Sequence, residues 1–206
     1  MIIHAKEKKE RALGEKLFLK AHRCSSPKCS MIRRPYRPGV HGKNRRKISD
    51  FGTQLMAKQK LKITYGVSEH KLKNIFKEAS SNPSATGEKM IELLERRLDN
   101  TVFRAGFADS RPMAHNLVSQ GHISVNGKRT RIPSFIIRKG DKIGIREESK
   151  QRSFAKDLKE KAKSVSLPIW LSLEPEKLTA EVKAIPKETD MVFDVSRVIE
   201  FFSKNN

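Results

Sequence analysis

The sequence predicts an α+β protein in which a mainly helical outer domain carries an inserted, smaller α+β module. Apolar residues recur with helical spacing in three segments between residues 50 and 105. Further along, the pair Asn126-Gly127 follows a short alternating segment, and this pair is the strongest short-range signal for a β-hairpin. We therefore expect the module to consist of two helices packed on a short, mostly antiparallel sheet. The predicted parts are a basic arm (1–48), a helical N-terminal domain (49–90), the module (91–150) and a C-terminal segment (151–206).

The first 48 residues are basic and lack a regular apolar period. Prolines and glycines interrupt every stretch long enough to form a regular element, at Pro27, Pro35, Pro38, Gly39 and Gly42. Such a segment is expected to bury little surface by itself. We interpret it as an arm that becomes ordered against a phosphate backbone.

Two helices are predicted in the domain that follows. Asp50 is placed to cap a helix that runs to about Ile63, and Gly66 ends it. Ser68 is placed to cap a second helix, in which the apolar residues at helical spacing are Leu72, Ile75, Phe76 and Ala79. The polar stretch Ser80–Gly87 is predicted as a loop.

The module is predicted to begin with one long helix over Glu88–Ala105, which Gly106 ends. Its apolar stripe comprises Met90, Ile91, Leu94, Leu98 and Val102. A second, polar face comprises Arg96, Asn100 and Arg104, which are spaced four residues apart, together with the adjacent Arg97. We expect this polar face to be exposed.

A short helix, a hairpin and further strands complete the module. Ser110 is placed to cap the helix and Gly121 to end it, with the strand His122–Val125 next. Beyond the Asn-Gly turn, two apolar patches flank a turn at residues 139–141; these are Phe135–Ile137 and Ile143–Ile145.

The last 56 residues are predicted to pack back on the helical domain. Ser153–Lys163 is expected to form an exposed helix, Leu178–Ile185 a strand and Val195–Phe202 a short closing helix.

Charge is the main indication of function. The chain has 44 Lys and Arg against 23 Asp and Glu, a net charge of +21. The excess lies in residues 1–50 (+11) and 101–150 (+6), whereas residues 151–206 carry only +1. Such a balance is typical of nucleic-acid binding. A membrane is disfavoured as partner, because no amphipathic basic helix is evident and no apolar run approaches the roughly 20 residues of a spanning helix. No phosphate-binding loop motif supports nucleotide hydrolysis.

The segment Ser110–Gly127 predicts the kind of nucleic acid. Its helix exposes Arg111, His115 and Gln120, and the hairpin that follows presents further cations. Donors on two adjoining rigid elements suit the phosphates and 2′-hydroxyls of folded RNA. Few aromatic residues are interleaved with the basic ones, and the chain has one Trp and two Tyr, which argues against single strands stacked on an aromatic platform. Structured RNA, recognised by shape, is therefore the predicted partner.

The run SRPMAHNLVSQGHISVNGKRTRIPSFIIRKGDKI (Ser110–Ile143) resembles the RNA-binding module of ribosomal small-subunit protein four. The preceding LLERRLDNTVFRAGFADS is similar to that family's first module helix. CSSPKCSMIRRPYRPGVHG (Cys24–Gly42), KQKLKITYGVSE (Lys58–Glu69) and WLSL (Trp170–Leu173) resemble other parts of the same family, in the same order. The resemblance therefore extends over nearly the whole chain and is to the bacterial or organellar type.

This resemblance implies a non-catalytic constituent of the small ribosomal subunit that binds its rRNA at a five-way helix junction and nucleates assembly. It implies contacts with ribosomal proteins three and five and with mRNA where it enters the subunit, and an influence on translational accuracy. No small-molecule substrate and no cofactor are expected. A cytoplasmic ribosome is the expected location, with an organellar one as the alternative. A free-standing RNA chaperone or translational repressor is the alternative function. The predicted RNA-binding residues are Arg33, Arg34, Arg37, Arg45, Arg46, Lys47, Lys58, Lys60, Lys62, Arg96, Arg97, Asn100, Arg104, Arg111, His115, Gln120, His122, Lys128, Arg129 and Arg131.

Three other signals are disfavoured. Some members of the family bind zinc with four cysteines, but here only Cys24 and Cys29 are present and the matching stretch begins and ends with Glu7 and Glu10. Zinc stays an open alternative. The GXXG of residues 39–42 lacks the flanking helices of a KH domain. Asp99 lies in an Arg-Leu-Asp sequence that resembles the motif of pseudouridine synthases, but those enzymes place it in a separate catalytic domain.

Overall fold

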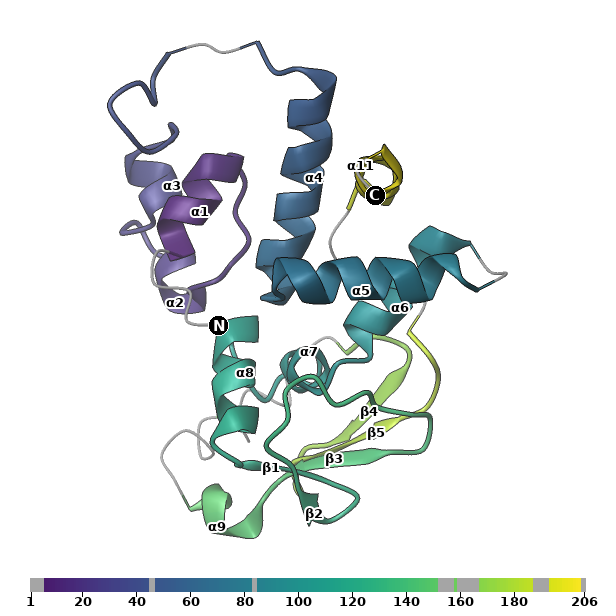
Figure 1. The fold of residues 1–206 in the computed structure, drawn as a ribbon. Helices are drawn as coiled ribbons and strands as arrows, with labels where there is room; N and C mark the ends of the chain where they lie inside the picture. The colour runs from purple at the N-terminus through teal and green to yellow at the C-terminus, as the bar shows by residue number, and fades with distance from the viewer. Residues whose placement is uncertain are drawn as a thin grey trace. The chain divides into compact units, whose positions relative to one another are not determined.

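The computed structural model describes residues 6–44, 47–82, 85–151, 158, 167–186 and 193–204. The chain is α+β and forms two compact units, one of residues 1–90 with 190–206 and one of residues 91–189 (Figure 1). No helix within these described ranges is both long and apolar enough to cross a bilayer.

The basic arm is folded. It contains three short helices, namely α1 (Lys6–Leu13), α2 (Ala21–Cys24) and α3 (Ser30–Arg33). Leu17, Leu19, Cys24 and Cys29 are each at most 3% exposed. The prediction of an arm without a packed core of its own is wrong, because these buried residues are spaced irregularly and gave no periodic signal.

Two longer helices of this unit follow the sequence signals closely. They are α4 (Asp50–Tyr65), which Gly66 ends with φ 65°, and α5 (Glu69–Ser80). The Oγ of Ser68 caps α5 by accepting from Lys71 N, as predicted, and the four predicted apolar residues of α5 are buried. For α4 the cap is Ser49 and not Asp50, since Ser49 Oγ accepts from Gly52 N at 3.2 Å.

The closing helix α11 (Val195–Lys204) packs on α4 and α5, as expected. Gln54 Nε2 donates to Glu200 at 2.9 Å. The rings of Phe76 and Phe202 stack with centroids 5.0 Å apart.

The predicted long helix over Glu88–Ala105 is wrong. The structure has α6 (Thr86–Glu95) and α7 (Leu98–Arg104), separated at Arg96 and Arg97. Arg97 is extended and forms an isolated bridge with Ile136, and Ile137 N donates to Arg96 O at 2.9 Å. This long-range pairing of the backbone interrupts a sequence that is locally suited to a helix.

The rest of the second unit begins with the predicted short helix, but Ser110 stands at the N-cap position without a side-chain capping hydrogen bond, so the predicted cap is wrong. Helix α8 (Arg111–Ser119) ends before Gly121, which has φ 76°. Strands β1 (Ile123–Val125) and β2 (Lys128–Arg129) form a hairpin. Its turn residues Asn126 and Gly127 both have positive φ, the conformation that an Asn-Gly hairpin turn requires.

The sheet is larger than predicted and extends beyond residue 150. Strand β3 (Lys142–Ile145) pairs with β5 (Thr179–Val182), which in turn pairs with β4 (Leu171–Glu174). All pairings are antiparallel, in the order β2-β1-β3-β5-β4, and α7 and α8 lie together along this sheet (Figure 1). The boundary predicted at residue 150 is wrong, because the apolar faces of β4 and β5 complete the core of this second unit.

A short helix, α9 (Glu147–Lys150), follows β3. The helix predicted over Ser153–Lys163 lies outside the described residues, except for Leu158, which is buried. The core between the helices and the sheet comprises Leu98, Val102, Phe107, Val118, Ile123, Ile143 and Leu178, all fully buried.

Candidate RNA-binding surface

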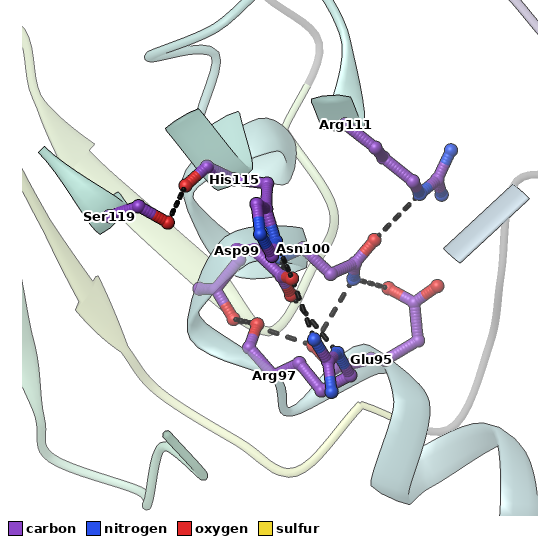
Figure 2. Close-up of polar contacts among 8 residues, drawn as sticks. Glu95, Arg97, Asp99, Asn100, Arg111, His115 and Ser119 are labelled. Carbon is purple, nitrogen blue, oxygen red and sulfur yellow. Dashed lines mark hydrogen bonds and ion pairs between the residues drawn. The ribbon is translucent and has the colours of Figure 1, made fainter. Parts of the chain in front are cut away.

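A buried ionic network joins the end of α6 to α7 (Figure 2). Glu95, which is fully buried, accepts from both Nε and Nη2 of Arg104 at 2.9 Å. It also accepts from Asn100 Nδ2 at 2.7 Å. A buried carboxylate needs such partners, because transfer of an unpaired charge from water to the interior is costly.

A second ion pair lies beside the first. Arg97 donates to both carboxylate oxygens of Asp99, at 3.1 and 2.7 Å. His115 Nδ1 lies 3.1 Å from Asp99 Oδ2. The predicted exposed face is therefore wrong for Arg97, Asn100 and Arg104, which are at most 5% exposed. These three side chains hold neighbouring residues in place.

The network fixes Arg111 at the start of α8 (Figure 2). Arg111 Nε donates to Asn100 Oδ1 at 2.8 Å, and its guanidinium lies 4.5 Å from the centroid of the Phe103 ring. One turn further on, His115 is partly exposed and Ser119 Oγ donates to its carbonyl at 2.8 Å. Arg96, the remaining member of the predicted face, is half-buried and donates to Ile137 O and Glu92.

Cations gather at the carboxyl end of α8. Lys128, Arg129 and Arg131 are exposed on and after the hairpin. Arg129 Nη2 donates to Gln120 O, and Arg146 Nη1 donates to Gly121 O, each at 3.4 Å. Desolvation, together with the positive charges of Arg131 and Arg146, lowers the pKa of Arg129.

Gly121 ends α8 and lies against the guanidinium of Arg129. A Cβ at this position would lie 2.5 Å from Arg129 Nε, and its φ of 76° is one that L side chains rarely adopt. His122, predicted to face RNA, is instead 7% exposed. Its ring bridges Ser149 Oγ (3.0 Å) and Gln120 Oε1 (3.2 Å).

In the first unit, Arg33, Arg34 and Lys47 are exposed and Arg37 is half-buried. Arg45 and Arg46 lie outside the described residues. Sequence reasoning missed Arg11, whose Nε donates to the carbonyls of Arg34 and Tyr36, at 3.0 Å each. Its position among other basic residues gave no sign of this role.

The three predicted lysines of α4 are engaged by carboxylates. Lys58 is 5% exposed, and its Nζ donates to Glu69 at 2.5 Å and lies 4.0 Å from the centroid of the Phe201 ring. The side chain of Lys58 is therefore buried. Lys62 pairs with Glu69 at 2.7 Å, and Lys60 pairs with Glu15 at 2.5 Å.

The carboxylate beside Cys24 is engaged by backbone amides. Glu10 Oε1 accepts from Leu17 N and Leu19 N, at 3.1 Å each, and Cys24 Sγ lies 3.8 Å from Glu10 Oε2. Burial, reinforced by the negative charge of Glu10, raises the pKa of the Cys24 thiol. Within the part of the chain that the structure describes, no group of three or more His, Cys, Asp or Glu could hold a metal.

The chain matches two family models in sequence. Residues 2–95 match the ribosomal protein S4/S9 N-terminal domain, and residues 96–143 match the S4 domain. The small ribosomal subunit protein uS4 of Gloeobacter violaceus is 46% identical over 196 residues, which is 94% of each chain. The uS4 proteins of Thermus thermophilus and Ruminiclostridium cellulolyticum are 45% and 43% identical over 93% of each chain. This chain belongs to the ribosomal protein S4 family.

Proposed function

We propose that this protein is a structural, non-catalytic constituent of the small ribosomal subunit. In this proposal it binds small-subunit rRNA at a five-way helix junction and nucleates assembly of the subunit body. Family membership along almost the entire chain supports this role, because the relatives bear the name of a small-subunit protein.

The observation that carries rRNA binding is the set of exposed cations around the end of α8. Lys128, Arg129 and Arg131 are exposed on and after a hairpin whose strand β1 pairs with β3, and Arg129 also donates to Gln120 O at the end of α8. Arg111 is held by Asn100 and Phe103 at the other end of the helix. Cations on rigid elements recognise the spacing of phosphates in folded RNA, and their binding releases counterions.

Further partners follow from the family resemblance. Ribosomal proteins three and five are the proposed protein neighbours, with mRNA near the point where it enters the subunit, and the contact with protein five is proposed to influence accuracy. The nearly neutral C-terminal quarter, with a net charge of +1, suits contacts with protein better than contacts with RNA.

A binding titration tests the proposal. The purified protein should prefer an rRNA fragment with the five-way junction over a random RNA of equal length. Its affinity should fall steeply between low and moderate salt. Loss of one phosphate contact in Arg131→Ala should reduce the salt slope by about 1. Lys177→Ala is the control, since Lys177 pairs with Glu174 at the β4–β5 turn. Equal affinity for the random RNA would contradict the proposal.

Ribosome fractionation separates this role from that of a free-standing RNA chaperone or translational repressor. A constituent should co-sediment with small subunits in equal amounts after washing in high salt. A protein that is washed off would support one of the other two roles.

A further inference from the structure

Three described residues other than glycine have clearly positive φ: Phe18 (53°), Asn126 (50°) and Leu178 (52°). Asparagine adopts this conformation readily in a hairpin turn. The fully buried side chain of Leu178 offsets its backbone strain by packing in the core. Phe18 has neither explanation, because its side chain is 52% exposed.

A buried carboxylate imposes the conformation of Phe18. Glu10 is 1% exposed, and its Oε1 accepts from the amides on both sides, Leu17 N and Leu19 N, at 3.1 Å each. Leu17 and Leu19 are also buried, so the residue between them projects outward. Its backbone is therefore held rigidly by the folded part of the arm.

The fold itself gives no reason for phenylalanine at this position. Glycine or asparagine would accept the positive φ with less strain and would expose less apolar surface. A strained and exposed aromatic residue is instead expected where it binds something.

The surroundings of Phe18 favour a nucleic-acid base as that partner. Lys16 and Lys20 are exposed on either side of it in the chain, and Lys20 Nζ lies 3.4 Å from Glu7 Oε1. Residues 1–50 carry a net charge of +11. A protein groove that took up the ring would have to desolvate nearby ammonium groups, whereas RNA would offer them phosphates.

We propose that Phe18 is a stacking platform for an unpaired base of the rRNA, and that Glu10 is the positioning residue that presents its ring. This inference rests on the proposed rRNA binding. Phe18 would add one stacking contact to an interface in which the other proposed contacts are between cations and phosphates.

The test uses full-length Phe18→Gly, Phe18→Leu and Phe18→Tyr in the rRNA junction titration and in urea unfolding. Phe18→Gly should be at least as stable as the wild type, because the strain is relieved. It should nevertheless bind roughly 5- to 100-fold more weakly, with an unchanged salt slope, because stacking releases no counterions. Phe18→Leu should lose a similar factor, and Phe18→Tyr should bind as the wild type does.

Phe51→Leu is the matched control. Phe51 is 53% exposed and belongs to the same unit, but its ring packs against Phe201 with centroids 5.6 Å apart. This substitution should leave RNA binding unchanged.

The outcomes separate the two proposals. A wild type without preference for the junction would refute the proposed function itself. A wild type that prefers the junction while Phe18→Gly and Phe18→Leu bind equally well would overturn the stacking role alone. If these variants bind the junction RNA normally but are not incorporated into small subunits, the stacking role is also overturned, and Phe18 contacts a protein instead. A parallel loss of stability and affinity in Phe18→Gly would mean that Phe18 is only structural.

Discussion

Glu95→Ala should strongly destabilise the second unit. Glu95 is fully buried and accepts three side-chain hydrogen bonds, two from Arg104 and one from Asn100. Its removal would leave the guanidinium of Arg104 buried without its carboxylate partner. Breaking a buried ion pair in this way costs about 3–5 kcal/mol. For a domain whose total stability is about 5–15 kcal/mol, this loss is severe.

Urea unfolding followed by Trp170 fluorescence measures this loss. Trp170 is the single tryptophan, is 6% exposed and packs in the core of the same unit, so it reports on that unit alone. With a urea dependence of about 1–3 kcal/mol per molar, the midpoint should fall by roughly 1–5 M. Glu174→Ala is the control, because the Glu174–Lys177 pair is exposed and should contribute nothing measurable.

Two results would refute this reasoning. The first is a Glu95→Ala midpoint that matches the control. The second concerns the double variant Glu95→Leu with Arg104→Met, which replaces the whole pair by apolar groups and should recover most of the stability. If the double variant is as unstable as Glu95→Ala, the loss of the carboxylate partner of Arg104 is not the cause.

Three further predictions concern other sites. Arg111→Ala should weaken junction binding and cost about 1 kcal/mol of stability. Val118→Asp, at a fully buried position of the same helix, should instead unfold the second unit. Equal stability losses of the two variants in urea would contradict the assignment of Arg111 to the outer face of α8 and of Val118 to its buried face. Although burial raises the pKa of Glu69, hydrogen bonds from two lysines outweigh it and hold that pKa below its ordinary value of 4.5. Glu69 therefore contributes stability that is present above pH 4.5 and is lost as the pH falls through the lowered pKa. In an acid titration, the Glu69→Gln variant should therefore lose less free energy of unfolding than the wild type, by under about 1 kcal/mol. Because the Cys24 thiol is 3% exposed and its pKa is raised, it should react with an alkylating reagent only after unfolding. Fast labelling of Cys24 in the native protein, measured by mass spectrometry, would contradict its burial.

Features set by nearby residues could be predicted from the sequence. The cap of α5 at Ser68, its buried face and the Asn126-Gly127 turn depend on interactions within a few residues, and the structure has all of them. In the same way, Gly66 and Gly121 end α4 and α8 with positive φ.

Features set by distant parts of the chain could not be predicted in this way. The break at Arg97 depends on a pairing with Ile136, nearly forty residues further on, although the local sequence favours a continuous helix. Likewise, β4 and β5 are only four residues long, and they join the second unit because β3 offers an open edge.

The ionic network shows why the candidate site was predicted only in part. Asn100 and Arg104 recur at a step of four, the pattern of an exposed polar face, and a sequence pattern cannot distinguish solvent from a buried carboxylate such as Glu95. The charged residues of the second unit therefore divide into two groups. Exposed ones such as Arg131 can neutralise phosphates directly, so their loss should lower both the affinity and its salt slope. Buried ones such as Arg104 act by holding the exposed ones in place, so their loss should lower the affinity while the slope for the remaining contacts is retained.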